Sequence, residues 1–251
     1  MIDSHCHIYL NDFANDIDET ISRALSSGIS NMILPNIDDK SVEPLSSLGK
    51  KYPDIFINAL GLHPTSVKSD YKQQLENIFS GKVLINGIGE TGIDLYWDKT
   101  YFKEQQKAFD YQLDKACRLN LPIIIHSRNS LGEVVDIVKN YVPKGITGVF
   151  HCFPGNSEDA KKIINMGFYI GIGGVITYKN NNMTEVVESI PLEHILTETD
   201  SPYLTPVPHR GKRNEPSYLQ HIVSKIAEIK KCDKSLVDEV TSKNSKKLFR
   251  L

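Results

Sequence analysis

The chain has 251 residues, a formal net charge of −2 and a pI near 6.4, so it is long enough for one large domain but lacks the basic surface typical of a nucleic-acid-binding domain. Its four cysteines are scattered and form no C-x-x-C pair, which argues against a disulfide framework and a thiolate zinc site. No leader-like segment precedes the first apolar run, and no run approaches membrane-spanning length. The sequence therefore predicts a cytoplasmic protein without membrane contact.

Short apolar runs recur along the chain at the spacing of one strand plus one helix. They begin near residues 1, 29, 55, 83, 121, 147, 168 and 194. Eight strands separated by helical segments favour a single (β/α)8 TIM barrel over residues 1–251, and a doubly wound open sheet is the alternative. The clearest helix is expected over residues 101–119 with Thr100 as its N-cap, and Asn156 is expected to open another helix.

Side chains that bind metals occur where the predicted strands end. The first run carries His5 and His7, which share one face because strand residues alternate, whereas Cys6 points to the other face. In a barrel, the C-terminal ends of the strands meet at one mouth, where active sites lie. The run that begins near residue 83 ends at Glu90. Later runs end in three more candidates: His126, His151 and Asp200.

Four histidines and two carboxylates are more ligands than one ion needs. Glu90 could bridge two divalent cations. The remaining ligands would then divide between the ions, with His5, His7 and Asp200 on one and His126 and His151 on the other. Mixed nitrogen and oxygen ligands suit Zn, Mn, Co or Ni readily, whereas Mg prefers oxygen. We expect two divalent metal cations per chain, with Mg, Mn and Zn as candidates.

Several motifs resemble those of one known family. In chain order they are residues 3–7 (DSHCH), 61–64 (GLHP), 89–94 (GETGID), 122–128 (PIIIHSR), 151–153 (HCF), 198–204 (ETDSPYL), 210–216 (RGKRNEP) and 244–249 (NSKKLF). On these motifs the chain resembles the TatD-type metal-dependent deoxyribonucleases of the amidohydrolase superfamily. It departs slightly at Ile8 and Pro154, neither of which is a predicted ligand. The resemblance implies a (β/α)8 barrel that hydrolyses DNA phosphodiesters and carries metal on the six positions named above.

The chain lacks a Gly-x-Ser-x-Gly elbow, so a metal-activated water is expected as the nucleophile. Asp200 and Glu90 are the predicted catalytic residues, and Asp200 is the candidate to take the proton of that water. Glu198 lies two residues before Asp200 on the same face, one layer deeper. We expect Glu198 to orient a metal ligand or to pair with a nearby cation.

Four residues near the predicted mouth are candidates for substrate binding: His63, Arg128, His209 and Arg210. His63 could contact a phosphate or protonate the leaving group, and a structural role in a turn is the alternative. Arg128 could hold a phosphate, or it could pair with Glu198 or Glu90. His209 and Arg210 belong to the basic cluster 209–213, whose position after the last strand favours phosphate binding over a solvated loop.

Aromatic residues also fall near the predicted mouth: Tyr96, Trp97, Tyr101 and Tyr203. They could stack on unpaired bases or pack within their loops. The sequence thus predicts a deoxyribonuclease that trims single-stranded or frayed ends, contacts a few phosphates and needs no obligate protein partner. A metal-dependent esterase or amidase, including an aminoacyl-tRNA deacylase, is the main alternative, and a non-catalytic binding protein on the same scaffold is a third possibility.

Overall fold

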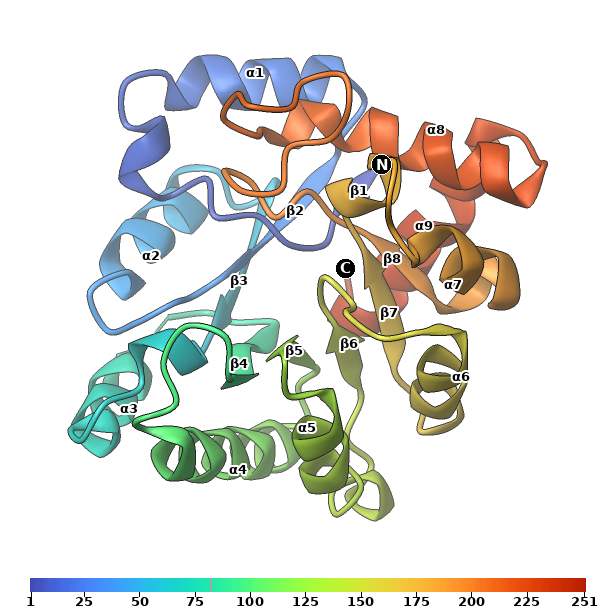
Figure 1. Cartoon of the computed structure of the whole chain (residues 1–251). Coiled ribbons are helices and arrows are strands. Elements are labelled where there is room, and N and C mark those ends of the chain that lie inside the picture. Colours follow the sequence, from blue (N-terminus) through green and yellow to red (C-terminus); the bar gives the residue numbers. More distant parts are fainter. Residues whose placement is uncertain (82) are drawn as a thin grey trace.

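The strands form a ring in chain order. The computed structural model describes residues 1–81 and 83–251. Every neighbouring pair from β1 to β8 is parallel. The backbone of Ser4 donates a hydrogen bond to Thr197 O at 3.0 Å, which joins the end of β8 to the segment after β1. The helices surround this ring (Figure 1). The predicted (β/α)8 barrel is therefore confirmed.

Strands and helices alternate up to α8, and α9 then follows without a further strand. The strands are β1 (Ile2–Asp3), β2 (Asn31–Pro35), β3 (Phe56–Leu60), β4 (Gly87–Asp94), β5 (Ile123–Arg128), β6 (Gly148–Phe150), β7 (Tyr169–Ile172) and β8 (Ile195–Thr197). The helices are α1 (Ile17–Ser26), α2 (Val42–Lys51), α3 (Tyr71–Ser80), α4 (Phe102–Leu119), α5 (Leu131–Val138), α6 (Ser157–Asn165), α7 (Met183–Ser189), α8 (Leu219–Lys230) and α9 (Lys234–Phe249). Among the described residues, we find no helix with the length and apolarity needed to cross a bilayer.

The last helix, α9, fills the end of the barrel at which the strands begin. Leu248 and Phe249 pack in one buried cluster with strand residues such as Ile2 and Leu196. Asn86, which immediately precedes β4, donates a hydrogen bond to Phe249 O at 3.2 Å. Because this end is filled by side chains, the barrel opens at the C-terminal ends of the strands, where the sequence predicts the active site.

The first strand is shorter than predicted, and both N-terminal histidines lie beyond it. After β1 the backbone is shared between two neighbours: Cys6 N donates to Ile33 O at 3.1 Å, and His7 N donates to Ser201 O at 2.7 Å. This alternation keeps His5 and His7 on the inner side, as predicted, while the Cys6 side chain is fully buried in the core.

The bounds of β4 and β8 also differ from the prediction. β4 begins at Gly87 and runs past Glu90 to Asp94, because its pairing with β5 continues as far as Asp94 opposite Arg128. β8 ends at Thr197, so Asp200 lies in the loop that follows the strand. Pairing with neighbouring strands, which a local apolar run does not encode, decides where these strands start and stop.

Helix boundaries follow the sequence pattern more closely. Asn156 caps α6 as predicted, since its side chain accepts hydrogen bonds from Glu158 N and Asp159 N at 2.9 and 3.0 Å. The predicted Thr100 cap of α4 is wrong, because Tyr101 occupies the N-cap position and the helix begins at Phe102. The inner face of α4 is buried at Phe109, Leu113 and Ala116, as its spacing predicts.

Candidate metal centre

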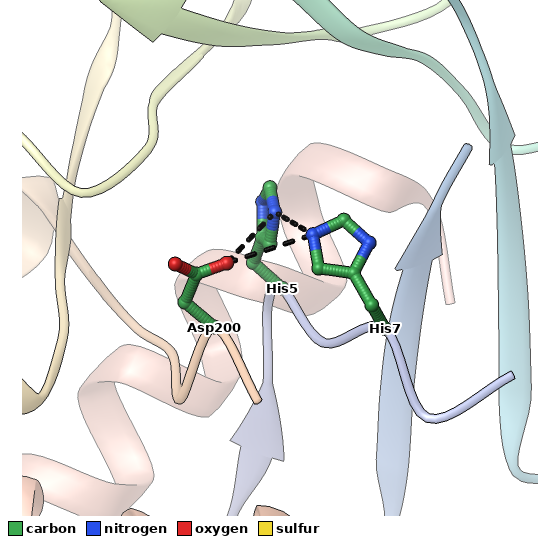
Figure 2. Close-up of side chains that lie close together, drawn as sticks. All are labelled: His5, His7 and Asp200. Carbon is green, nitrogen blue, oxygen red and sulfur yellow. Dashed lines mark hydrogen bonds and ion pairs between the residues drawn. The ribbon is translucent and has the colours of Figure 1, made fainter. Parts of the chain in front are cut away.

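Three predicted ligands converge just beyond β1 and β8, as Figure 2 shows. The Nε2 atoms of His5 and His7 lie 3.1 Å apart. Asp200 Oδ1 lies 3.6 Å from His5 Nε2 and 3.5 Å from His7 Nε2. Both imidazoles are buried, and the Asp200 side chain is only 13% exposed. The three ligand atoms face one point, which is a geometry that suits a divalent cation.

Glu90 on β4 lies at the centre of the cluster and is buried. Its Oε2 lies 3.1 Å from His5 Nε2 and 3.5 Å from His7 Nε2. Its Oε1 lies 2.9 Å from His126 Nδ1 and 3.2 Å from His151 Nε2. Each carboxylate oxygen therefore faces a different group of imidazoles, as expected of a carboxylate that bridges two ions.

The outer nitrogen of His7 is held by a tyrosine. His7 Nδ1 lies 3.0 Å from the hydroxyl of Tyr9, and that hydroxyl donates its hydrogen to Pro35 O at 2.6 Å. Because the hydroxyl has one hydrogen, it accepts from the Nδ1–H group of His7. The Nε2 atom of His7 is then the nitrogen available for a cation, which fits a metal ligand.

Carboxylates orient His126 and His151 in the same way. His126 Nε2 lies 3.0 Å from Asp94 Oδ2, so its Nδ1 atom points to Glu90. His151 Nδ1 lies 3.1 Å from Glu198 Oε1, so its Nε2 atom points to Glu90. A carboxylate that accepts the second N–H group is the common support of a metal-ligating histidine. Glu198 thus lies where a residue that orients a ligand is expected.

His63 has the opposite hydrogen-bonding pattern. Its Nδ1 atom accepts a hydrogen bond from Thr65 N at 3.2 Å, so the neutral imidazole carries its hydrogen on Nε2. Burial lowers the pKa of His63 and favours this neutral form. Its Nε2 atom lies 3.3 Å from Glu90 Oε1. In the neutral form, His63 therefore presents a donor to the site, whereas neutral His7, His126 and His151 present lone pairs.

The charges of the site attract cations. Burial opposes the ionised form of Glu90, but the surrounding imidazoles, His151 first, hold its pKa well below the ordinary value. A hydrogen bond from His7 likewise keeps the pKa of Asp200 low against burial. Burial in turn lowers the pKa of His7, but its hydrogen bonds to Asp200 and Glu90 outweigh this and raise the pKa to about 9. Glu90 and Asp200 thus remain ionised and stabilise positive charge beside them, whether that charge is a proton on His7 or a bound cation.

A cavity of about 800 Å³ opens onto these residues. His63 and Arg128, two of the predicted substrate-binding residues, lie in its wall. Within residues 1–81 and 83–251, Arg128 pairs with neither Glu90 nor Glu198, and its guanidinium carbon instead lies 3.9 Å from the centre of the Tyr96 ring. Arg128 therefore keeps its charge available at the cavity.

His209 and Arg210 are not among the described residues that line this cavity. His209 stacks on Tyr218, with ring centroids 4.0 Å apart. The guanidinium carbon of Arg210 lies 3.8 Å from the centre of the Tyr178 ring. The two side chains are thus packed on separate tyrosines, and the structure does not bring them to the metal centre.

Arg213, which belongs to the basic cluster 209–213, forms an ion pair with Asp16. Its two terminal nitrogens each lie 2.7 Å from a carboxylate oxygen of Asp16. These bonds hold the pKa of Asp16 well below its ordinary range. Nearby, Arg23 binds Glu215 at 2.7 Å, which further ties the loop after β8 to α1. Arg213 serves this ion-pair network, so its charge is already balanced by Asp16.

A buried glutamine that the sequence pattern did not reveal supports the site from α4. Gln112 Oε1 accepts a hydrogen bond from Leu62 N at 2.8 Å, and its amide donates to Thr91 Oγ1 at 2.6 Å. Leu62 precedes His63 and Thr91 follows Glu90. One side chain therefore fixes the backbone beside two residues of the site.

Gln105 acts in the same way two helical turns earlier. Its Oε1 accepts a hydrogen bond from Asp94 N at 2.9 Å, and Asp94 is the acid that orients His126. The sequence does contain one indication of these two buried amides. Gln105 and Gln112 are seven residues apart, which places both on the apolar face of one helix.

The Gln112→Leu protein should be less stable and less active than the parent. Leucine has a similar volume but leaves Leu62 N and Thr91 Oγ1 without their hydrogen-bond partner. Each buried group that loses its partner should lower the unfolding free energy by roughly 1–3 kcal/mol. We also expect a lower kcat, because the backbone beside His63 and Glu90 loses its support. Urea unfolding and steady-state kinetics measure both effects. Gln106→Leu, on the same helix, is the matched control, and parent-like values in both assays for Gln112→Leu would refute this supporting role.

The sequence belongs to a known family. The family described as TatD-related DNase matches residues 2–250, so the chain belongs to that family. An uncharacterized metal-dependent hydrolase of Bacillus subtilis, YabD, is 35% identical over 254 residues, covering 100% of this chain and 99% of that protein. An uncharacterized metal-dependent hydrolase of Mycoplasma genitalium, MG009, is 33% identical and covers 98% of both chains.

Solved structures agree with this assignment. The TatD homologue YjjV of Escherichia coli superposes with a TM-score of 0.92 at 28% identity, covering 100% of this chain and 98% of that one. A TatD-family hydrolase of Entamoeba histolytica gives a TM-score of 0.83 at 23% identity over 99% of this chain and 97% of that one, which shows the shared fold. The predicted resemblance to the TatD family is therefore confirmed.

Proposed function

We propose that this protein is a divalent-metal-dependent deoxyribonuclease that hydrolyses DNA phosphodiesters with an activated water. The observation that carries the proposal is the division of the imidazoles between the two oxygens of Glu90. The proposed ligands are His5, His7 and Asp200 for one cation, His126 and His151 for the other, and Glu90 for both. Membership of the TatD-related DNase family supports DNA as the substrate, and relatives named metal-dependent hydrolases support the hydrolytic chemistry.

Divalent cations at these positions would lower the pKa of a water molecule and offset the charge of the phosphate. Mn and Zn fit the mixed nitrogen and oxygen donors, and Mg is the third candidate. Glu90 is a proposed catalytic residue because it fixes both ligand groups relative to each other. Glu198 and Asp94 contribute by holding the rings of His151 and His126.

Asp200 is the proposed general base. Its low pKa keeps it ionised at neutral pH, so it can accept a proton. It also lines the cavity, which makes its carboxylate accessible from the substrate side. His63 presents its Nε2–H group at the same cavity. We infer that His63 donates this hydrogen bond to a phosphate oxygen or to the leaving oxygen.

The cavity supports a short contact with nucleic acid. Apart from histidines, Arg128 is the one cationic side chain among the described residues of its wall. Arg213 is neutralised by Asp16, and the net charge of −2 provides no wide basic surface. Such a site can hold a few phosphates. We therefore infer that it trims single-stranded or frayed ends rather than cutting within a duplex.

A substrate panel tests this function. Metal-stripped protein, reloaded with Mg, Mn or Zn, is incubated with end-labelled single-stranded DNA, blunt duplex DNA, RNA, carboxylic esters and aminoacyl-tRNA. We expect stepwise shortening of single-stranded DNA that depends on metal and exceeds the rate on the blunt duplex. An Asp200→Asn preparation purified in the same way controls for contaminating nuclease. Turnover of an ester or of aminoacyl-tRNA without any cleavage of DNA would assign the site to the alternative hydrolase class.

A further inference from the structure

Two exposed aromatic residues and an arginine form one compact group at the edge of the cavity. Tyr96 and Trp97 follow β4, and their rings meet edge to face with centroids 4.9 Å apart. The guanidinium carbon of Arg128, the last residue of β5, lies 3.9 Å from the centre of the Tyr96 ring and 5.4 Å from that of Trp97. Trp97 and Arg128 both line the cavity.

The same acid that orients His126 also holds this aromatic group. Asp94 Oδ1 accepts hydrogen bonds from Tyr96 N and Trp97 N at 2.9 and 3.2 Å. Asp94 Oδ2 lies 3.0 Å from His126 Nε2. In addition, Leu95 N donates to Arg128 O at 2.9 Å. The aromatic group is therefore fixed relative to a proposed metal ligand by one carboxylate and by backbone pairing.

The aromatic faces are open to solvent in spite of this fixed geometry. Trp97 is 69% exposed and Tyr96 is 53% exposed. Two neighbouring aromatic side chains that are this exposed, beside a cavity, are typical of a binding site. Tyr111 offers a comparison, because it is also exposed but packs beside Phe79 and Lys115 on the outside of the barrel. Tyr96 and Trp97 differ from it in their place at the mouth.

We propose that Trp97, supported by Tyr96 and Arg128, is a stacking platform for one unpaired nucleobase of the substrate strand. This inference rests on the proposed nuclease function and adds the means by which the site selects unpaired strands. A base in a duplex has both faces covered by its neighbours, whereas an unpaired base offers a free face to an indole ring. Arg128 adds a positive charge that can meet the adjoining phosphate.

Trp97 is the only tryptophan of the chain, so its fluorescence reports on the platform directly. The probe is a short single-stranded oligonucleotide with uncleavable phosphorothioate linkages, added to the metal-loaded protein. A series of these oligonucleotides carries one abasic site at each position in turn. We expect the intact oligonucleotide to quench Trp97, and one abasic position to remove the quenching and raise Kd by about 5- to 150-fold, the range that corresponds to one stacked base.

Variants give a second readout of the same contact. In Trp97→Ala, an abasic site should no longer raise Kd, and KM on single-stranded DNA should be higher than in the parent. Trp97→Phe keeps an aromatic ring, so it should retain most of the abasic effect on Kd and a KM near that of the parent. Tyr111→Ala is the matched control and should behave as the parent does. The platform would be overturned if the oligonucleotide bound at saturation without changing Trp97 fluorescence. It would also be overturned if the abasic site raised Kd equally in the parent and in Trp97→Ala. If the parent neither binds nor cleaves DNA, both the proposed function and the platform are wrong. If the parent cleaves DNA and Trp97→Ala has the same KM as the parent, only the platform is wrong.

Discussion

The Asp200→Asn protein should fold normally and hydrolyse single-stranded DNA with a kcat lower by a factor on the order of 10² or more, the scale expected for loss of a positioned base. Asparagine has the same shape but cannot accept a proton at neutral pH. It also suits the backbone, since Asp200 has a φ of 56°, a left-handed conformation that asparagine tolerates better than most residues. Kinetics on end-labelled DNA, at saturating metal, give the result.

Two controls separate this catalytic effect from a loss of structure. The far-UV circular dichroism spectrum of Asp200→Asn should match that of the parent, because the barrel and its core are unchanged. Leu113→Ala, in the fully buried face of α4, should instead lower the unfolding free energy by roughly 2–5 kcal/mol and leave kcat nearly unchanged. Turnover of Asp200→Asn near the parent value would remove the assignment of Asp200 as the base.

The Glu90→Gln protein should lose both tight metal binding and activity. An amide has one oxygen, so its NH2 group must face either the lone pairs of His5 and His7 or those of His126 and His151. We expect metal affinity to fall by more than about 100-fold, because loss of a supporting residue behind a ligand already costs 10- to 100-fold. Metal content after dialysis against a fixed free metal concentration measures the effect.

The number of ions bound by Glu90→Gln can be compared with that bound by a double variant. His126→Ala combined with His151→Ala removes the imidazoles that face Oε1 but keeps His5, His7 and Asp200. This protein should therefore retain one of two ions. If it kept two ions, the proposed second ligand set would be incorrect, and if Glu90→Gln kept two tight ions, Glu90 would not bridge them.

Much of the barrel and the convergence of the candidate metal ligands could be predicted because both follow from local patterns. Apolar runs at the spacing of a βα unit indicate eight strands, and a histidine or acid at the end of a run points to the mouth. His126 and His151 are found in this way even where the strand bounds shift. The same pattern predicts Asp200 at the mouth, although β8 ends three residues before it.

The supporting contacts could not be predicted, because they depend on pairs that lie far apart in the sequence. Gln112 reaches Leu62 across 50 positions, and Arg213 reaches Asp16 across 197. A basic cluster in the sequence does not show that one of its arginines is already paired. Likewise, the reversed hydrogen bonding of His63 depends on the turn that brings Thr65 N to its ring.

A metal titration tests whether the site holds two cations bridged by Glu90. Metal-free protein receives increasing equivalents of Mn, and the initial rate of single-stranded DNA hydrolysis is measured beside the number of tightly bound ions. We expect the rate to rise to a plateau at two bound ions per chain. Full activity with one bound ion, or DNA hydrolysis that persists in the metal-free protein, would contradict it.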